Sequence, residues 1–218
     1  MIDDAWTQTL LAPNFRVKDW SAVRDRLDPQ KYDAQWRRVL SHIAARFNER
    51  FVGPADALVR RDKRFRRVPA GPGFAVLALD CILIETLFGY ERGARTELGE
   101  TGGAFIAFLK SQTGFDKGDR AASFARAVRN GVIHDGETRD GWTVWKGYVG
   151  GPLVNELSDR RLRVYRDAFH GAVKAYLADY FVRLRARDAD GTRLRGNFKT
   201  RIDRLCKDCA PRGTASPP

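Results

Sequence analysis

The chain has 218 residues, in which 39 Lys and Arg outnumber 27 Asp and Glu, so its formal net charge at pH 7 is +12. This length suits one domain with an ample buried core, and a hydrophobic content of 43% excludes a wholly disordered chain. The excess of positive charge favours nucleic acid as a partner over an anionic membrane surface. A basic surface can also serve only to keep a protein soluble.

The first 28 residues are expected to be irregular, with short apolar anchors, and to begin without a signal peptide. A helix is predicted over 29–50, because apolar residues recur there at spacings of three and four. Asp28 would cap this helix and Pro29 would occupy its first turn. Residues 60–67 carry six basic residues and one acid. This run is either a phosphate contact or a solvated face, and the Pro- and Gly-rich residues 69–73 should break the chain after it.

The most apolar segment, 74–90, predicts a buried core helix. It is shorter than the roughly 20 residues needed to span a bilayer, and Asp80 and Glu85 interrupt it, so no membrane partner is expected. Scattered glycines over 89–103 do not form a phosphate-binding loop. Two further helices are predicted, over 103–112 and 118–136.

The residue pattern changes at 142–165, where aromatic and β-branched residues alternate with turn signals. We predict a small β-insertion there, with strands at 142–145, 153–157 and 162–165. A long helix capped by Asp167 should run to about residue 187, and an amphipathic helix should cover 192–206. Residues 207–218 are expected to form a disordered tail. The fold class is therefore mainly α, with 29–206 as one helical domain that contains the β-insertion.

The cysteines do not form an even disulfide framework, which favours a reducing cytoplasm. Cys206 and Cys209 form one C-x2-C pair, which is only half of a zinc site, so neither a metal nor a cofactor is expected.

His170 and His42 lie on or beside apolar helix faces and are expected to be packing or capping residues. Trp142, Trp145 and Tyr148 can either stack on nucleobases or fill the core of the β-insertion.

The most informative stretch is 129–134, which places Arg129, Asn130 and His134 at a predicted helix end. A guanidinium stabilises phosphates and oxyanions, and an imidazole transfers protons near neutral pH. In an ideal helix, positions five apart lie about 140° apart around the axis. A local distortion at Gly131 would bring the two side chains together, and so would a second copy supplied by a partner chain.

The R-x4-H spacing with a polar residue after the arginine resembles the signature of the HEPN superfamily, in a plasmid-associated branch. The likeness covers residues 127–138, the apolar helix before them, and the β-insertion and long helix after them, or about 30–205 in all. This resemblance implies a helical bundle that forms a homodimer, with two motifs facing one cleft. It also implies metal-independent cleavage of RNA in toxin–antitoxin or phage-defence systems, and a possible antitoxin or regulatory partner.

The residue roles follow the chemistry of RNA cleavage, in which the 2′-OH is the nucleophile. We assign His134 to proton transfer, Arg129 to the phosphate, and Asn130 to the orientation of either. Glu85 and Asp80 are expected to support the site as partners of Arg129 and His134, because an unpaired buried carboxylate is costly. The alternatives for these acids are a plain buried ion pair or a side chain that simply reaches solvent.

Three nearby cations are candidate contacts to the RNA backbone: Lys117, Arg120 and Arg126. The rival to an endoribonuclease is a non-catalytic module of the same architecture that binds RNA or a nucleotide and dimerises. A third possibility is a toxin that carries a nucleotidyl or AMP modification and whose antitoxin is encoded nearby.

Overall fold

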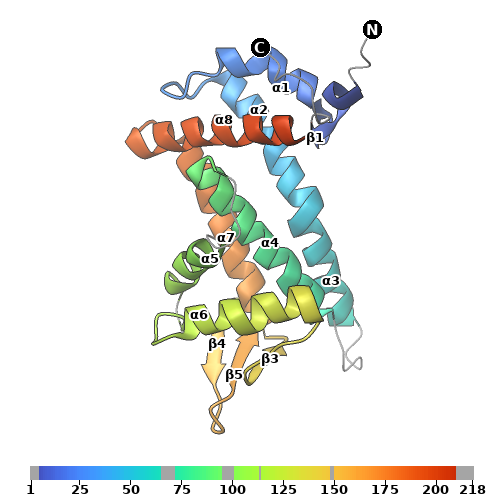
Figure 1. The fold of residues 1–218 in the computed structure, drawn as a ribbon, viewed down its shortest axis with the longest axis vertical. Helices are drawn as coiled ribbons and strands as arrows, with labels where there is room; N and C mark the ends of the chain where they lie inside the picture. The colour runs from blue at the N-terminus through green and yellow to red at the C-terminus, as the bar shows by residue number, and fades with distance from the viewer. Residues whose placement is uncertain (1–4, 65–71, 95–100, 113, 148–149, 210–218) are drawn as a thin grey trace. The chain divides into compact units, whose positions relative to one another are not determined.

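The computed structural model describes residues 5–64, 72–94, 101–112, 114–147 and 150–209, and these are mainly helical, as predicted (Figure 1). The chain divides into two compact units. The first comprises Met1–Glu49, Gly89–Arg95 and Asp179–Pro218, and the second comprises Arg50–Phe88 and Thr96–Ala178.

The first unit contains β1 (Leu10–Ala12), β2 (Phe15–Arg16), α1 (Val17–Val23), α2 (Ala34–Phe47) and α8 (Ala189–Cys209). It also contains the C-terminal ends of α4 (Gly73–Arg92) and α7 (Arg166–Arg185). The second unit contains α3 (Gly53–Arg64), most of α4 (Gly73–Arg92), α5 (Thr101–Lys110), α6 (Arg120–Phe124), β3 (Trp142–Trp145), β4 (Val154–Glu156), β5 (Leu162–Tyr165) and most of α7 (Arg166–Arg185).

The start of the chain is more regular than predicted, because its apolar anchors are buried. β1 and β2 pair antiparallel and lead directly into α1. Phe15 and Trp20 are both buried, and the Trp20 indole N–H donates to Asp203 Oδ1 at 2.7 Å. Phe15 stacks on His42 with ring centroids 4.8 Å apart, so His42 is a packing residue, as expected.

The first long helix starts later than the sequence suggested. Asp33, and not Asp28, is the N-cap of α2, and its side chain accepts the Trp36 backbone N–H at 3.0 Å. The Asp28 carbonyl instead accepts the Trp36 indole N–H at 2.8 Å. The predicted apolar stripe of α2 is buried throughout: Trp36, Val39, Leu40, Ile43 and Phe47.

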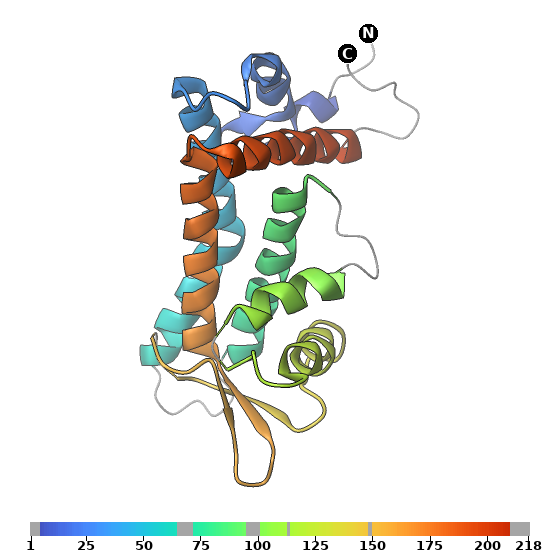
Figure 2. The same ribbon diagram turned by 90° about the vertical axis from the view of Figure 1, so that its left-hand side faces the viewer.

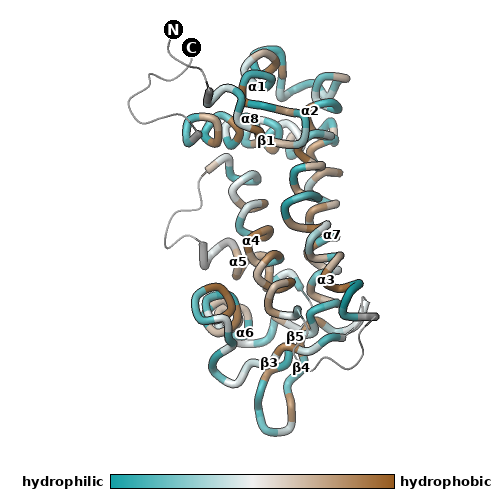
Figure 3. The backbone as a smooth tube through the Cα atoms, turned by 90° about the vertical axis from the view of Figure 1, so that its right-hand side faces the viewer, coloured by the Kyte–Doolittle hydropathy of each residue, from teal (hydrophilic) through white to brown (hydrophobic). Residues whose placement is uncertain are grey.

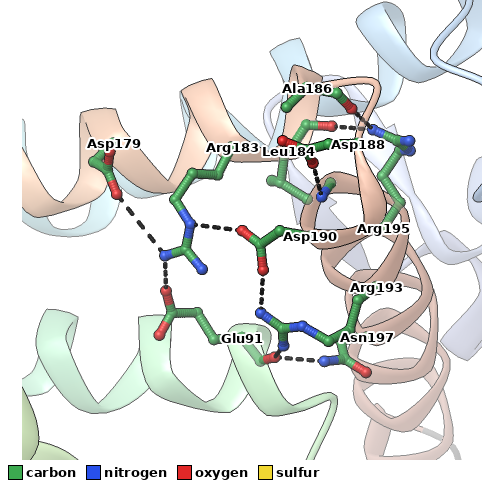
Figure 4. A network of polar contacts seen from close by, with 11 residues as sticks. Glu91, Asp179, Arg183, Leu184, Ala186, Asp188, Asp190, Arg193, Arg195 and Asn197 are labelled. Carbon is green, nitrogen blue, oxygen red and sulfur yellow. Dashed lines mark hydrogen bonds and ion pairs between the residues drawn. The ribbon is translucent and has the colours of Figure 1, made fainter.

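A buried arginine closes the corner between α7 and α8 (Figure 4). Arg195 is fully buried and donates to the carbonyls of Pro29, Leu184 and Ala186, each at 2.7 Å. The last carbonyls of a helix lack intrahelical partners, so Arg195 satisfies groups that the turn leaves open. The tail prediction was wrong at its start, since 207–209 are helical in α8, while 210–218 lie outside the described residues.

Helix α3 extends into the basic run, whose residues 60–64 are helical, while 65–67 lie outside the described residues. The single acid of the run, Asp62, is nearly buried, and its carboxylate accepts from Arg166 Nη2 at 2.7 Å and forms an ion pair with Lys146 Nζ at 3.3 Å. These pairs join α3 to the start of α7 through Arg166, and to the residue after β3 through Lys146. Asp167 does not cap α7 as predicted, because its carboxylate accepts from Arg166 Nε at 2.9 Å.

The core of the second unit is aromatic. Phe124 lies 5.2 Å, between ring centroids, from each of Phe115, Trp142 and Phe169. The Trp142 indole N–H donates to Ser123 Oγ at 3.0 Å. Trp142 therefore belongs to the core and not to a base-stacking surface.

The β-insertion forms at the predicted positions, with strand order β3-β5-β4. β3 is parallel to β5, and β4 is antiparallel to β5. β5 runs directly into α7 (Figure 2).

The apolar helix α4 (Figure 3) is long and hydrophobic enough to cross a membrane by length and composition. Half of its most apolar window is buried in the protein. Asp80 and Glu85 lie within it, and each forms an ion pair with a residue of the same unit. These internal ion pairs account for the two acids that interrupt the apolar pattern.

Candidate functional site

The motif lies on a helical segment whose turns are wider than those of an α-helix. Two π-helical turns, Ala125–Arg129 and Gly131–Asp135, flank Asn130. The Asn130 N–H bonds to the Ala125 carbonyl, and the Gly136 N–H bonds to the Gly131 carbonyl. In such turns residues five apart are about one turn apart. The backbone around the motif is therefore wound more widely than an α-helix.

Gly131 permits a close approach of the chain that follows. The Glu137 carbonyl lies so near that a Cβ atom on residue 131 would collide with backbone. The Glu137 N–H bonds to the Gly131 carbonyl at 3.3 Å, and the Arg139 N–H bonds to the Ala127 carbonyl at 3.0 Å. The loop after the motif is thus fastened to the motif helix. Gly136, at φ 70°, ends that helix as predicted.

Arg129 is held from two sides. Its Nε donates to Glu85 Oε1 at 2.6 Å, and its Nη1 donates to Asn130 Oδ1 at 2.8 Å. The Arg129 side chain is 22% exposed and that of Glu85 is 17% exposed. A half-buried carboxylate that accepts from Nε fixes the plane of the guanidinium, which presents its charge in one direction. The structure thus pairs Glu85 with Arg129, as the sequence suggested.

His134 is exposed, in the last turn before Gly136, next to the exposed Ile133. An exposed imidazole at a helix C-terminus can exchange protons with solvent or a bound ligand. Within the described residues no hydrogen bond joins His134 to Arg129. The single chain therefore presents an anchored guanidinium and an exposed imidazole on two neighbouring π-helical turns.

Asp80 does not join this arrangement, because it faces another helix. Its Oδ1 lies 2.8 Å from His170 Nδ1, and both side chains are buried. His170 Nε2 lies 3.2 Å from Asp56 Oδ1, and Lys174 Nζ lies 3.0 Å from both Asp56 oxygens. The expected support of Arg129 or His134 by Asp80 was wrong. Glu85 and Asp80 are five residues apart in α4 and so point in different directions.

The Asp56–His170–Asp80 chain was not foreseen as a unit, since its members lie far apart in the sequence. Burial lowers the pKa of His170, but the hydrogen bonds and charges of Asp80 and Asp56 outweigh burial, so this pKa lies above its ordinary value. Burial raises the pKa of Asp80. Burial opposes ionisation of Asp56 as well, yet Lys174 and His170 hold its pKa below the ordinary value.

The three candidate RNA-contacting cations differ in their surroundings. Arg120 is mostly buried and bonds to Glu156 Oε2 at 2.5 Å, which ties α6 to β4. Arg126 is 62% exposed and lies 3.3 Å from Asp140. Lys117 is exposed. Arg120 is thus engaged within the fold, while Arg126 and Lys117 remain accessible.

No match to this chain emerges from comparison with protein-family models, curated proteins or solved structures. In the part of the chain that the structure describes, no group of His, Cys, Asp and Glu is arranged to hold a metal ion. The side chains of the site supply one oriented cation, Arg129, and one exposed imidazole, His134.

Proposed function

We propose that this protein is an endoribonuclease that cleaves RNA by attack of the 2′-OH on the adjacent phosphate. His134 exchanges the proton of the nucleophile or of the leaving 5′-oxygen, and Arg129 stabilises the charge on the phosphorane. Asn130 and Glu85 position the guanidinium. The resemblance of residues 127–138 to the HEPN signature supports the same reaction.

One observation carries the proposal: Glu85 and Asn130 fix Arg129 one wide turn from an exposed His134. An ion pair that served only stability would not need an exposed histidine at this spacing. Oriented charge aimed at a developing oxyanion is worth far more than the same charge free in water, because no reorganisation is needed during the reaction.

One imidazole can accept the 2′-OH proton and return it to the leaving 5′-oxygen, so one His134 and one Arg129 complete a site. Within the described residues no hydrogen bond joins these two side chains of the same chain. We propose that a homodimer brings two motifs to one cleft, so that the imidazole of one chain acts with the guanidinium of its partner. Ile133, 36% exposed beside His134, and Ile82, 40% exposed on α4, are apolar residues suited to such an interface.

The test is cleavage of end-labelled single-stranded RNA by purified protein in EDTA. His134→Ala should reduce the rate about 10²- to 10⁴-fold, as expected for loss of acid–base catalysis. Arg129→Ala should reduce it about 10²- to 10³-fold, as expected for loss of an oriented charge. Arg37→Ala, which removes an exposed arginine from the first unit, is the control and should leave the rate unchanged.

Full activity of either motif variant, with unchanged helicity, contradicts the proposal. RNA binding by the wild-type protein without cleavage supports the rival function, a non-catalytic RNA-binding module. The anchored arginine is compatible with that rival, so the cleavage assay and not the binding assay decides between them.

A further inference from the structure

A second surface of the same unit combines an exposed aromatic ring with an arginine. Trp145, the last residue of β3, is 54% exposed, whereas Trp142 at the other end of the strand is buried. The Arg163 guanidinium carbon lies 4.2 Å from the centroid of the Trp145 ring. One guanidinium covers one face of an indole, so much of the ring remains open to a ligand.

Trp145 borders a cavity of about 470 Å³, within the range of about 300–1,000 Å³ that is typical of small-ligand sites. The cavity is lined by Trp145, Lys146, Gly147, Pro152 and Tyr165. Close packing and a hydrogen bond hold the wall of this cavity in place. Gly147 has φ 66° and lies so close to Tyr165 that a Cβ atom would be 2.7 Å from the tyrosine Cβ. The Tyr165 hydroxyl accepts from Asn155 Nδ2 at 3.2 Å.

Two cations at or beside the cavity can attract the phosphate of a ligand. Arg163 is not among the residues that line the cavity, but its guanidinium stacks on Trp145, which is, and its Nε is buried without a hydrogen-bond partner. Lys146 lines the cavity, and its amine lies 3.3 Å from Asp62. An open aromatic ring, a cation stacked on that ring and a concave wall are the features by which proteins hold a nucleobase and its phosphate.

We propose that this cavity is a nucleobase subsite for single-stranded RNA, in which a base stacks on Trp145 and its phosphate lies near Arg163. A paired base in a duplex is stacked between its neighbours and cannot enter such a cavity, so the ligand is single-stranded. An acidic peptide would use the arginine but would have no use for an exposed indole. This inference rests on the proposed function and specifies its substrate as unpaired RNA.

The experiment measures binding in the cleavage-deficient His134→Ala chain by fluorescence anisotropy of a labelled 12-residue single-stranded RNA in EDTA. Adding Trp145→Ala should raise the dissociation constant roughly 5- to 150-fold, the usual effect of removing one stacking aromatic. Trp145→Phe keeps a ring and should retain most of the affinity. Val182→Ala removes an equally exposed apolar side chain, 62% exposed, from the first unit and should change nothing.

A second pair of probes separates stacking from charge. The His134→Ala chain should prefer the 12-residue RNA over an abasic strand of the same length, and adding Trp145→Ala should abolish this preference. Affinity for a 12-base-pair RNA duplex should be unaffected by Trp145→Ala. Equal loss of affinity for the normal and abasic strands, or no loss at all, overturns the subsite.

The two proposals can fail separately. If the wild-type chain does not cleave RNA but Trp145→Ala weakens base-dependent binding, the nucleobase subsite is supported and the endoribonuclease proposal is wrong. If cleavage depends on His134 while Trp145→Ala binds and cleaves like the parent, the nuclease stands and the subsite falls. Displacement of the 12-residue RNA by an equal concentration of free uridine monophosphate would assign the cavity to a mononucleotide and overturn the assignment to RNA.

Discussion

Two acids in the same apolar helix have similar side chains but different partners. Glu85 and Asp80 both interrupt the hydrophobic pattern of α4. Glu85 holds Arg129 at 2.6 Å, whereas Asp80 holds His170 at 2.8 Å. A buried carboxylate requires a partner, so the sequence predicts that partners exist. Which partner each acid finds depends on the direction that its side chain takes from the helix.

The buried His170 should make stability depend on pH. Its pKa is raised in the folded protein, so the folded state binds this proton more tightly than the unfolded state does. The stability that this proton supplies is complete below the ordinary histidine pKa of about 6.5 and is lost as pH rises through the raised pKa. The groups that face His170 are Asp80, Asp56 and, through Asp56, Lys174.

Thermal unfolding followed by circular dichroism at pH 6 and pH 9 measures this effect. The Tm of the wild-type protein should be lower at pH 9 than at pH 6, by about 2–4 °C for each kcal/mol of stability lost. His170→Gln should have a lower Tm at pH 6, because Asp80 is left beside a neutral partner, and a smaller fall toward pH 9. An equal fall in both chains would show that His170 is not the titrating group.

At the scale of elements, the motif helix depends on an unusual turn. Helix propensity alone treats Gly131 as a weak point of about 1 kcal/mol. In the structure, Gly131 is required for packing, because only a residue without Cβ lets the Glu137 carbonyl approach the helix. The loop that follows is hydrogen-bonded back to the π-helical turns that carry His134.

Gly131→Ala should therefore lower the free energy of unfolding by about 1–3 kcal/mol, the usual cost of forcing a methyl group into filled space. RNA cleavage should fall with it, since the loop and the motif turn must move. Gly196→Ala in α8 is the matched control, because its Cβ would meet no atom within 4 Å. This control should hold or raise stability, as alanine favours a helix over glycine. Urea titration of both variants gives the comparison, and similar stabilities would rule out the steric role of Gly131.

At the scale of the whole molecule, the proposed homodimer makes a prediction about mixed chains. Arg129→Ala and His134→Ala chains should each be inactive, yet a mixture that exchanges subunits should cleave RNA faster than either alone. The physical reason is that one chain then supplies the guanidinium and the other the imidazole. Native mass spectrometry of chains with different tags confirms that mixed dimers have formed. Mixed dimers without any gain in cleavage would place both groups of a working site on one chain.

The mainly helical class, the β-insertion and the R-x4-H motif could be predicted from the sequence, because hydrophobic period and motif spacing are local properties of the chain. The N-cap at Asp33, the regular structure before residue 28 and the true start of α7 were missed. Contacts distant in sequence stabilise two of these features, Trp20 with Asp203 before residue 28 and Arg166 with Asp62 at the start of α7. The cap at Asp33 is local, but the hydrophobic pattern does not say which of two nearby aspartates begins the helix.

By itself the sequence determined which side chains are available: a guanidinium, a carboxamide and an imidazole at one helix end, and acids that need partners. Only the tertiary structure decided that Glu85 and not Asp80 holds Arg129, that Trp142 is core, and that Trp145 is exposed beside Arg163. The reason is physical. A helix or strand fixes the order and spacing of its residues, but the direction in which each side chain finds its neighbour is set by packing between elements far apart in the chain.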